Sequence, residues 1–201
     1  MFRRLFTHSL LVFCPLLVSL IALTRLIGGG QSPHPALLGF IDCLAAETLQ
    51  CWYGITPGST STADAQRTII ALGYRFGVSN QDSDTYLAPV ASRWCDVRLS
   101  HYGGSIVRNI FLSCREAQIR IGDMMALLGA PERMDVDYVF AMLRNPARGL
   151  AYRVQTWTSP YDYIDNIDLS LPYVLSNHPH PWHGFISKAN YCRYEPGGAG
   201  C

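Results

Sequence analysis

The chain has 201 residues, of which 49% are hydrophobic, and a net charge of +1 at pH 7. This length fits one domain or two small ones after an N-terminal leader is set aside, and the hydrophobic content is sufficient for a packed core. The near-neutral charge excludes the basic footprint of a nucleic-acid-binding domain. Charged residues make up 15% of the chain, against about 25% in ordinary soluble domains, which is more typical of an exported protein.

The N-terminus has the composition of an export signal. Arg3 and Arg4 precede an apolar run over 9–23, and a basic region followed by an apolar one directs export. The run alone is shorter than the about 20 residues of a membrane-spanning helix, but 5–27 reaches that length. We expect 1–30 to be an uncleaved anchor with the body outside the cytoplasm, because the two arginines would stay inside. A cleaved signal peptide, and hence a secreted body, is the open alternative.

Composition divides the rest of the chain into a linker and two similar units. The stretch from Gly28 to Pro35 is too rich in Gly, Ser and Pro to hold a helix or strand. The predicted organisation is a leader at 1–30, a linker with a short helix at 31–50, a first helix-plus-sheet unit at 51–116, and a second unit with a His/Pro-rich loop and a Cys-containing tail at 117–201.

The first unit begins with a helix whose start and end are both marked by capping residues. Ser61 lies three residues before Asp64, the spacing at which a hydroxyl and a carboxylate cap the first free N–H groups of a helix. Gly73 supplies the left-handed residue that ends it. Apolar residues at helical spacing form one face: Ala65, Ile69 and Leu72. We therefore expect a helix over 62–72.

The second unit repeats this pattern in a shorter form. The motif I-x-x-G at 119–122 matches the one at 55–58, and Asp123 is the expected N-cap. Gly129 ends the helix, and Pro131 prevents it from resuming. The short apolar face consists of Met124, Leu127 and Leu128.

Alternating apolar residues predict strands after each helix, which makes the fold class α+β. The predicted strands are 74–79, 93–101, 105–114, 134–143, 150–158 and 164–171. The segment 77–89 is expected to be a solvated loop. Its Asp82 and Asp84 do not form a calcium site, because the glycine and distal glutamate of a calcium loop are missing.

The helix-plus-sheet unit resembles the small outer-membrane assembly lipoproteins of the BamE (SmpA/OmlA) type. Its doubling resembles the tandem architecture of beta-lactamase-inhibitor-type (BLIP-like) domains. The resemblance is carried by Ile119, Gly122, Asp123, Leu127, Leu128, Gly129 and Pro131, and more loosely by Ile55, Gly58, Thr60 and Gly73. It implies a non-catalytic binding domain in an envelope compartment. Phe13 departs from the pattern, because a small residue precedes the lipidated cysteine of such proteins and Phe13 precedes Cys14.

The body contains six cysteines in addition to Cys14 of the leader. An even number in an exported body indicates disulfides. In a hairpin turning at Gly103-Gly104, Val97 would face Ile110, and Cys95 would be a diagonal neighbour of Cys114. The predicted pairs, each closing a short loop, are Cys43–Cys51, Cys95–Cys114 and Cys192–Cys201. Free buried thiols are the alternative.

A histidine-rich loop is the candidate metal site. His178, His180 and His183 lie close together on a Pro-rich loop, and histidine is the commonest protein ligand of zinc and copper. The alternative is an exposed loop in which Trp182 packs down.

No recognised catalytic motif is present. The chain has no G-x-S-x-G, no Gly-rich phosphate loop and no H-E-x-x-H. His101 is expected to be exposed at a hairpin tip. The remaining acidic residues considered, which lie in alternating or turn contexts, are expected to face solvent: Asp135, Asp137, Asp162, Asp165 and Asp168.

These patterns favour a membrane-tethered protein-interaction module with no enzyme activity and no cofactor, whose partner is an envelope or cell-surface protein. Aromatic residues are the candidates for the partner surface or, alternatively, for the core: Trp52, Trp157, Tyr161 and Tyr163. The alternative functions are an exported metal-binding protein that uses the histidine loop, and an exported hydrolase without a recognisable motif.

Overall fold

The chain forms two compact units, Met1–Pro33 and His34–Cys201. The computed structural model describes residues 13, 15–20, 33–45, 51–90, 92, 94–101, 104–136, 141–145, 150–154, 159–170, 180–185, 189–190 and 193. Within these residues, no helix combines the length and the hydropathy needed to cross a membrane.

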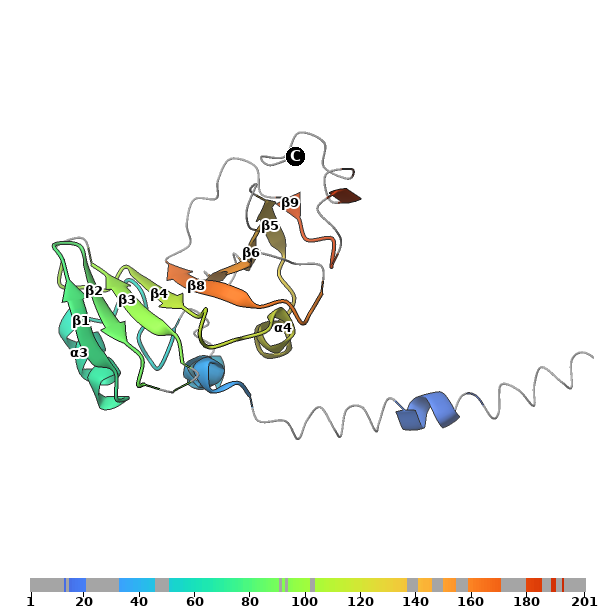
Figure 1. Ribbon diagram of the computed structural model, residues 1–201, viewed down its shortest axis with the longest axis horizontal. Helices are drawn as coiled ribbons and strands as arrows, with labels where there is room; N and C mark the ends of the chain where they lie inside the picture. The colour runs from blue at the N-terminus through green and yellow to red at the C-terminus, as the bar shows by residue number, and fades with distance from the viewer. Residues whose placement is uncertain are drawn as a thin grey trace, which may run out of the picture. The chain divides into compact units, whose positions relative to one another are not determined.

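The second unit has an α+β fold built on one nine-stranded antiparallel sheet (Figure 1), so the predicted fold class is confirmed at this level. Its elements in chain order are η1 (Pro35–Leu37), α2 (Leu38–Ala45), α3 (Thr62–Ala71), β1 (Arg75–Ser79), β2 (Ser83–Leu87), β3 (Asp96–Ser100), β4 (Asn109–Ser113), α4 (Ile121–Leu128), β5 (Arg133–Val136), β6 (Ala141–Asn145), β7 (Leu150–Val154), β8 (Ile164–Ser170) and β9 (His180–Pro181).

The order of strands across the sheet is symmetric about its middle. The order is β1-β2-β3-β4-β8-β7-β6-β5, with the short β9 added beside β5. Helix α3 precedes β1 to β4 in the chain, and α4 precedes β5 to β8. Each half is therefore a helix followed by four strands, and the halves join through the last strand of each.

The joining strands have nearly the same sequence and pair about a local two-fold axis. β4 reads Asn-Ile-Phe-Leu-Ser and the last five residues of β8 read Asn-Ile-Asp-Leu-Ser. Phe111 pairs with Asp168 at the centre, and Asn–Ser pairs lie at both ends of the ladder: Asn109 with Ser170 and Ser113 with Asn166. This pairing is what an internally duplicated chain produces when its two copies associate through the same strand, by analogy with a two-fold dimer interface.

One face of this sheet carries the core. Apolar strand residues alternate with polar ones, so the apolar set gathers on one side. The buried strand residues on this side are Tyr86, Val97, Leu99, Ile110, Leu112, Tyr152, Val154, Ile164, Ile167 and Leu169. They form one cluster with helical residues Leu37, Phe40, Ala65, Ile69, Ile121, Met124 and Leu128. Both α3 and α4 therefore pack on the same face, and Figure 1 shows α3 alongside β1 and β2.

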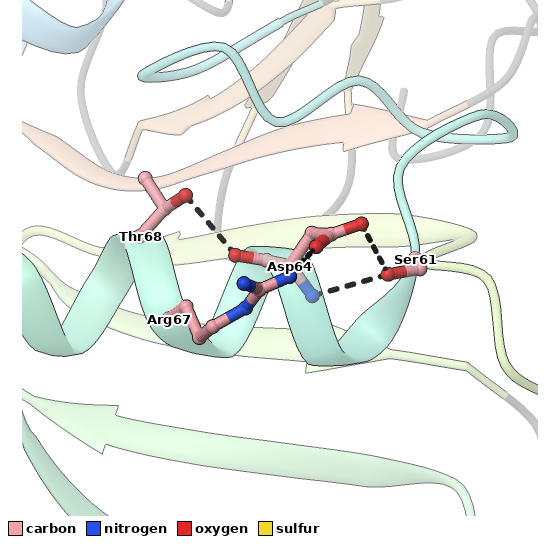
Figure 2. A network of polar contacts seen from close by, with 4 residues as sticks. All are labelled: Ser61, Asp64, Arg67 and Thr68. Atoms are coloured by element: carbon pink, nitrogen blue, oxygen red, sulfur yellow. Dashed lines mark hydrogen bonds and ion pairs between the residues drawn. The ribbon is translucent and has the colours of Figure 1, made fainter.

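Helix α3 confirms the predicted start and stop. The Asp64 backbone N–H donates to Ser61 Oγ at 3.1 Å, and the Ser61 hydroxyl donates to the Asp64 carboxylate at 2.6 Å (Figure 2). Arg67 also contacts this carboxylate. The Ser61 hydrogen bond and the Arg67 charge hold the pKa of Asp64 below its usual value. At the other end Gly73 has a φ of +90°, which the terminating position requires.

Helix α4 starts three residues earlier than predicted, and Asp123 is not its N-cap. Arg120 occupies that position, and its backbone N–H donates to the Asp123 carboxylate at 3.3 Å. Asp123 therefore reaches back from the first turn as the acidic residue of a capping box does. Gly129 has a φ of 85° and ends the helix, as predicted.

Two strand predictions were wrong because one strand was missed in each half. The expected loop at 77–89 contains β2, in which Tyr86 is fully buried. The polar residues around Tyr86 concealed this strand, because only one apolar side chain of β2 faces the core. The expected single strand at 134–143 is two antiparallel strands, β5 and β6.

The hairpin register also differs from the prediction. Val97 pairs with Leu112 rather than with Ile110, and Asp96 pairs with Ser113. The connection between β3 and β4 runs from residue 101 to residue 108, so the strands are displaced relative to a tight turn at Gly103-Gly104. This register brings Cys95 and Cys114 within 4.3 Å, measured between their Cα atoms.

Two of the three predicted disulfides are confirmed: Cys43–Cys51 and Cys95–Cys114. Cys192 and Cys201 lie outside the described residues, as does Cys14. All four bonded cysteines are buried.

Replacing both Cys95 and Cys114 by alanine should lower the free energy of unfolding by about 3 kcal/mol, because the bond restricts a loop of this length in the unfolded chain. The Cys43–Cys51 bond closes a shorter loop. The matched Cys43→Ala/Cys51→Ala variant should therefore lose about 0.6 kcal/mol less of the free energy of unfolding than the first variant. Urea unfolding of both variants measures the difference. An unchanged urea midpoint for the first variant would contradict the expected contribution.

Candidate functional site

The face of the sheet opposite the helices is polar, and we call it the polar sheet face. Its described residues on the central strands share the outward side of the ladder: Thr85, Asp96, Arg98, Ser100, Asn109, Phe111, Ser113, Asn166 and Asp168. Arg98 is exposed, Asn166 is buried, and the others are half-buried. The polar sheet face therefore continues from one half of the molecule into the other.

An arginine and an aromatic ring lie at the centre of the polar sheet face. Arg98 pairs with Phe111 in the ladder, and Phe111 pairs with Asp168 across the seam between the halves. The Arg98 guanidinium carbon lies 5.6 Å from the centre of the Phe111 ring. This distance allows an attractive cation–π contact and holds the guanidinium over the sheet.

A hollow of about 350 Å³ opens beside the beginning of β3 and the end of β4. It is lined by Ala88, Pro89, Ser92, Trp94, Asp96, Ser113, Arg115 and Glu116. Asp96 and Ser113 are a ladder pair of the polar sheet face, so the hollow is continuous with that face.

The Cys95–Cys114 disulfide positions four lining residues of the hollow. Both cysteine side chains are buried in the core. Because side chains alternate along a strand, Asp96 at the start of β3 and Ser113 at the end of β4 are directed away from the core, toward the hollow. Trp94 and Arg115 lie just beyond these strand ends and also line the hollow, and Trp94 packs against the core as well. The disulfide therefore fixes two walls of the hollow relative to each other.

Trp94 and Asp96 are each held by a specific contact. The Trp94 ring packs on Tyr74 at 5.5 Å between ring centres, and the Tyr74 hydroxyl donates to the Cys95 carbonyl at 3.1 Å. Asp96 Oδ1 accepts a hydrogen bond of 2.8 Å from the Ala88 backbone N–H. Burial raises the pKa of Tyr74, and the nearby charge of Asp96 adds to this shift.

The charged residues of the hollow are not neutralised by one another. Asp96, Arg115 and Glu116 form no ion pair within the part of the chain that the structure describes. Arg115 and Glu116 are exposed, whereas Asp96 is half-buried. The Ser92 hydroxyl oxygen is also buried and has no hydrogen-bond partner among the described residues.

The structure separates the aromatic residues proposed for the partner surface. Trp52 is 1% exposed and belongs to the core, so the core alternative holds for this residue. Tyr161 and Tyr163 are 70% and 51% exposed, and the Arg120 guanidinium lies 5.5 Å from the Tyr161 ring centre. Trp157 lies outside the described residues.

The histidine loop is described only in part. His180 belongs to β9, which pairs with β5, and His183 is exposed. His178 lies outside the described residues. Among those that are described, no three His, Cys, Asp or Glu residues are grouped closely enough to hold a metal ion. Metal binding by this loop therefore stays a prediction.

His101 is not the exposed residue that the sequence predicted. Its side chain is 13% exposed, and Nε2 lies 3.5 Å from the carboxylate of Asp84, which is 14% exposed. Asp84 belongs to the missed strand β2, and this explains why neither residue is fully solvated. Asp162, Asp165 and Asp168 are half-buried.

Sequence reasoning found the disulfide but not the hollow beside it. The available signal was the alternation around the two cysteines, Trp-Cys-Asp at 94–96 and Ser-Cys-Arg at 113–115. Once the cysteines are paired and inward, the adjacent strand residues Asp96 and Ser113 must lie on the other side of the sheet. Glu116, Ser92 and Ala88 come from turns and could not be placed in this way.

Comparison with known proteins assigns no family to this chain. No protein-family model and no curated protein matches the chain. One solved structure that it resembles is a DUF4309 family protein (YjgB) from Bacillus subtilis subsp. subtilis str. 168, at 14% sequence identity and a TM-score of 0.46. The match covers 70% of this chain and 99% of that one.

The buried tyrosines should make the fold sensitive to alkali. Burial raises the pKa of Tyr86 from 10.0 to about 12 and also raises the pKa of Tyr152. The folded state therefore retains protons that the unfolded chain loses above pH 10. The contribution of these tyrosines to the free energy of unfolding is fully present below pH 10 and is lost as the pH rises toward about 12.

Urea unfolding at a series of pH values would measure this loss, and Tyr86→Phe should make it shallower. A free energy of unfolding that stays constant through this range would contradict the assignment.

Proposed function

We propose that this chain is a non-enzymatic, extracytoplasmic protein-interaction module, tethered to the membrane or secreted, and that the polar sheet face is its partner surface. The observation that carries this proposal is the asymmetry of the sheet. One face is buried under α3 and α4, whereas the opposite face presents half-buried and exposed side chains on strands of both halves.

The composition of the polar sheet face supports protein binding. Arginine and aromatic residues are enriched at the centres of protein interfaces, and the Arg98–Phe111 contact lies in the middle row of the ladder. Sheet strands hold their side chains in fixed positions, which reduces the entropy lost on binding. The exposed Tyr161 and Tyr163 extend the candidate surface.

Two observations support an extracytoplasmic location for the module. Disulfides persist in oxidising compartments, and two disulfides join described residues of the body. The basic and apolar N-terminal segment supports an export signal or anchor. The repeated order of one helix and four strands supports kinship with BamE-type or tandem beta-lactamase-inhibitor-type domains, which would make the protein a binding component of an envelope.

Site-specific photo-cross-linking in cells that express the full chain tests this proposal. A photoreactive residue at Ser100, on the polar sheet face, should form a discrete cross-linked species. The same residue at exposed Ala63 on α3 should not. Arg98→Ala should reduce the yield from position 100 by about fivefold, the effect of removing an important interface arginine.

The matched control is Arg67→Ala, because Arg67 is exposed on α3 and its removal should leave the yield unchanged. Equal cross-linking from positions 100 and 63, or none from position 100, would refute the polar sheet face as the partner surface.

A further inference from the structure

We propose that the hollow beside Cys95–Cys114 receives one cationic side chain, an arginine or a lysine, of the protein partner. This inference rests on the proposed function, because the cation belongs to the protein that docks on the polar sheet face. The hollow and that face share the ladder pair Asp96–Ser113, so one partner segment can contact both.

The charge of the hollow favours a cation. Among the lining residues that the structure describes, two carry carboxylates, Asp96 and Glu116, and one carries a guanidinium, Arg115. Within the described part of the chain, none of the three is engaged in an ion pair. The Ala88 backbone N–H fixes one carboxylate oxygen of Asp96, and the second oxygen remains available to accept from an incoming ammonium or guanidinium group.

The aromatic wall adds a second attraction for the same group. Trp94 lines the hollow and packs on Tyr74, which in turn is fixed by its hydrogen bond to the Cys95 carbonyl. Indole rings attract lysine and arginine cations more strongly than other aromatic side chains do. The Trp94 indole and the Asp96 carboxylate thus line the same space.

The hollow is formed before any partner arrives. The disulfide joins the two chain segments that carry Trp94, Asp96 and Ser113. The volume of the hollow is about 350 Å³, which lies within the range of about 300–1,000 Å³ of ligand pockets. A long basic side chain fits this space, and a fixed site loses less entropy on binding than a mobile one.

Arg115 makes the charge argument testable in both directions. Its exposed guanidinium opposes a bound cation, whereas Asp96 and Glu116 attract it. Neutralising an attractive group should weaken binding and neutralising Arg115 should strengthen it. A hollow that selects by shape alone would show neither change.

The experiment titrates the full chain, labelled with 15N-tryptophan in detergent micelles, with acetyl-Gly-Arg-Gly-amide. Matched peptides carry glutamine or glutamate in place of arginine. The indole N–H signal of Trp94, assigned by its loss in Trp94→Phe, should shift saturably with the arginine peptide and not with the others. Asp96→Asn and Glu116→Gln should each weaken binding by about threefold, in the range of partly exposed ion pairs, and Arg115→Gln should strengthen it by a similar factor.

Asp96→Asn keeps an oxygen that can accept from the Ala88 N–H, so its effect reports charge rather than a lost hydrogen bond. An unchanged Trp94 signal at saturating arginine peptide would overturn the proposal. So would preference for the glutamate peptide, or equal affinity of all three charge variants.

Failure of this inference differs from failure of the proposed function. If the arginine peptide does not bind but cross-linking from Ser100 persists undiminished in Asp96→Asn, the partner surface stands and the cation site falls. If no cross-link forms from Ser100, the proposed function fails, and the assignment of the cation to a partner protein fails with it.

Discussion

The pairing of β4 with β8 is the contact on which the rest of this structure depends. It joins two four-strand arrays into one sheet and brings α3 and α4 to the same side, so that a single core forms. Ile110 and Leu112 of one strand meet Leu169 and Ile167 of the other. Alternation then requires Phe111 and Asp168 to lie on the opposite side, and the polar sheet face arises from the same register as the core.

The disulfide at the end of the β3–β4 ladder has a comparable double effect. It closes the core beside the aromatic residues of the first half, and it joins the two strand ends whose residues Asp96 and Ser113 line the hollow. Under the proposed function, the same covalent constraint contributes to stability and to partner binding. The proposed binding function rests on this sheet face, with its half-buried and exposed polar side chains, and on the hollow beside it.

Helix-capping residues and cysteine spacing made part of this architecture predictable. The Ser61 cap and Gly73 stop located α3, and cysteine spacing located two disulfides, because these features depend on neighbouring residues. Strand β2 was missed because a single buried residue, Tyr86, carries its apolar signal. The joining of the halves was missed because it depends on a long-range pairing. The near-identity of the segments 109–113 and 166–170 was its signal in the sequence. The hollow could not be predicted without the register that pairs Asp96 with Ser113.

Native-state hydrogen exchange in denaturant tests the central role of the β4–β8 pairing most directly. The account predicts that the slowest amides of β3 and β4 share one opening free energy with those of β7 and β8. It also predicts that Leu169→Ala, which removes a buried contact at the seam, lowers both by about 3 kcal/mol. Different opening free energies in the two halves, or unchanged protection of β3 in Leu169→Ala, would show that the halves are independent and would contradict the account.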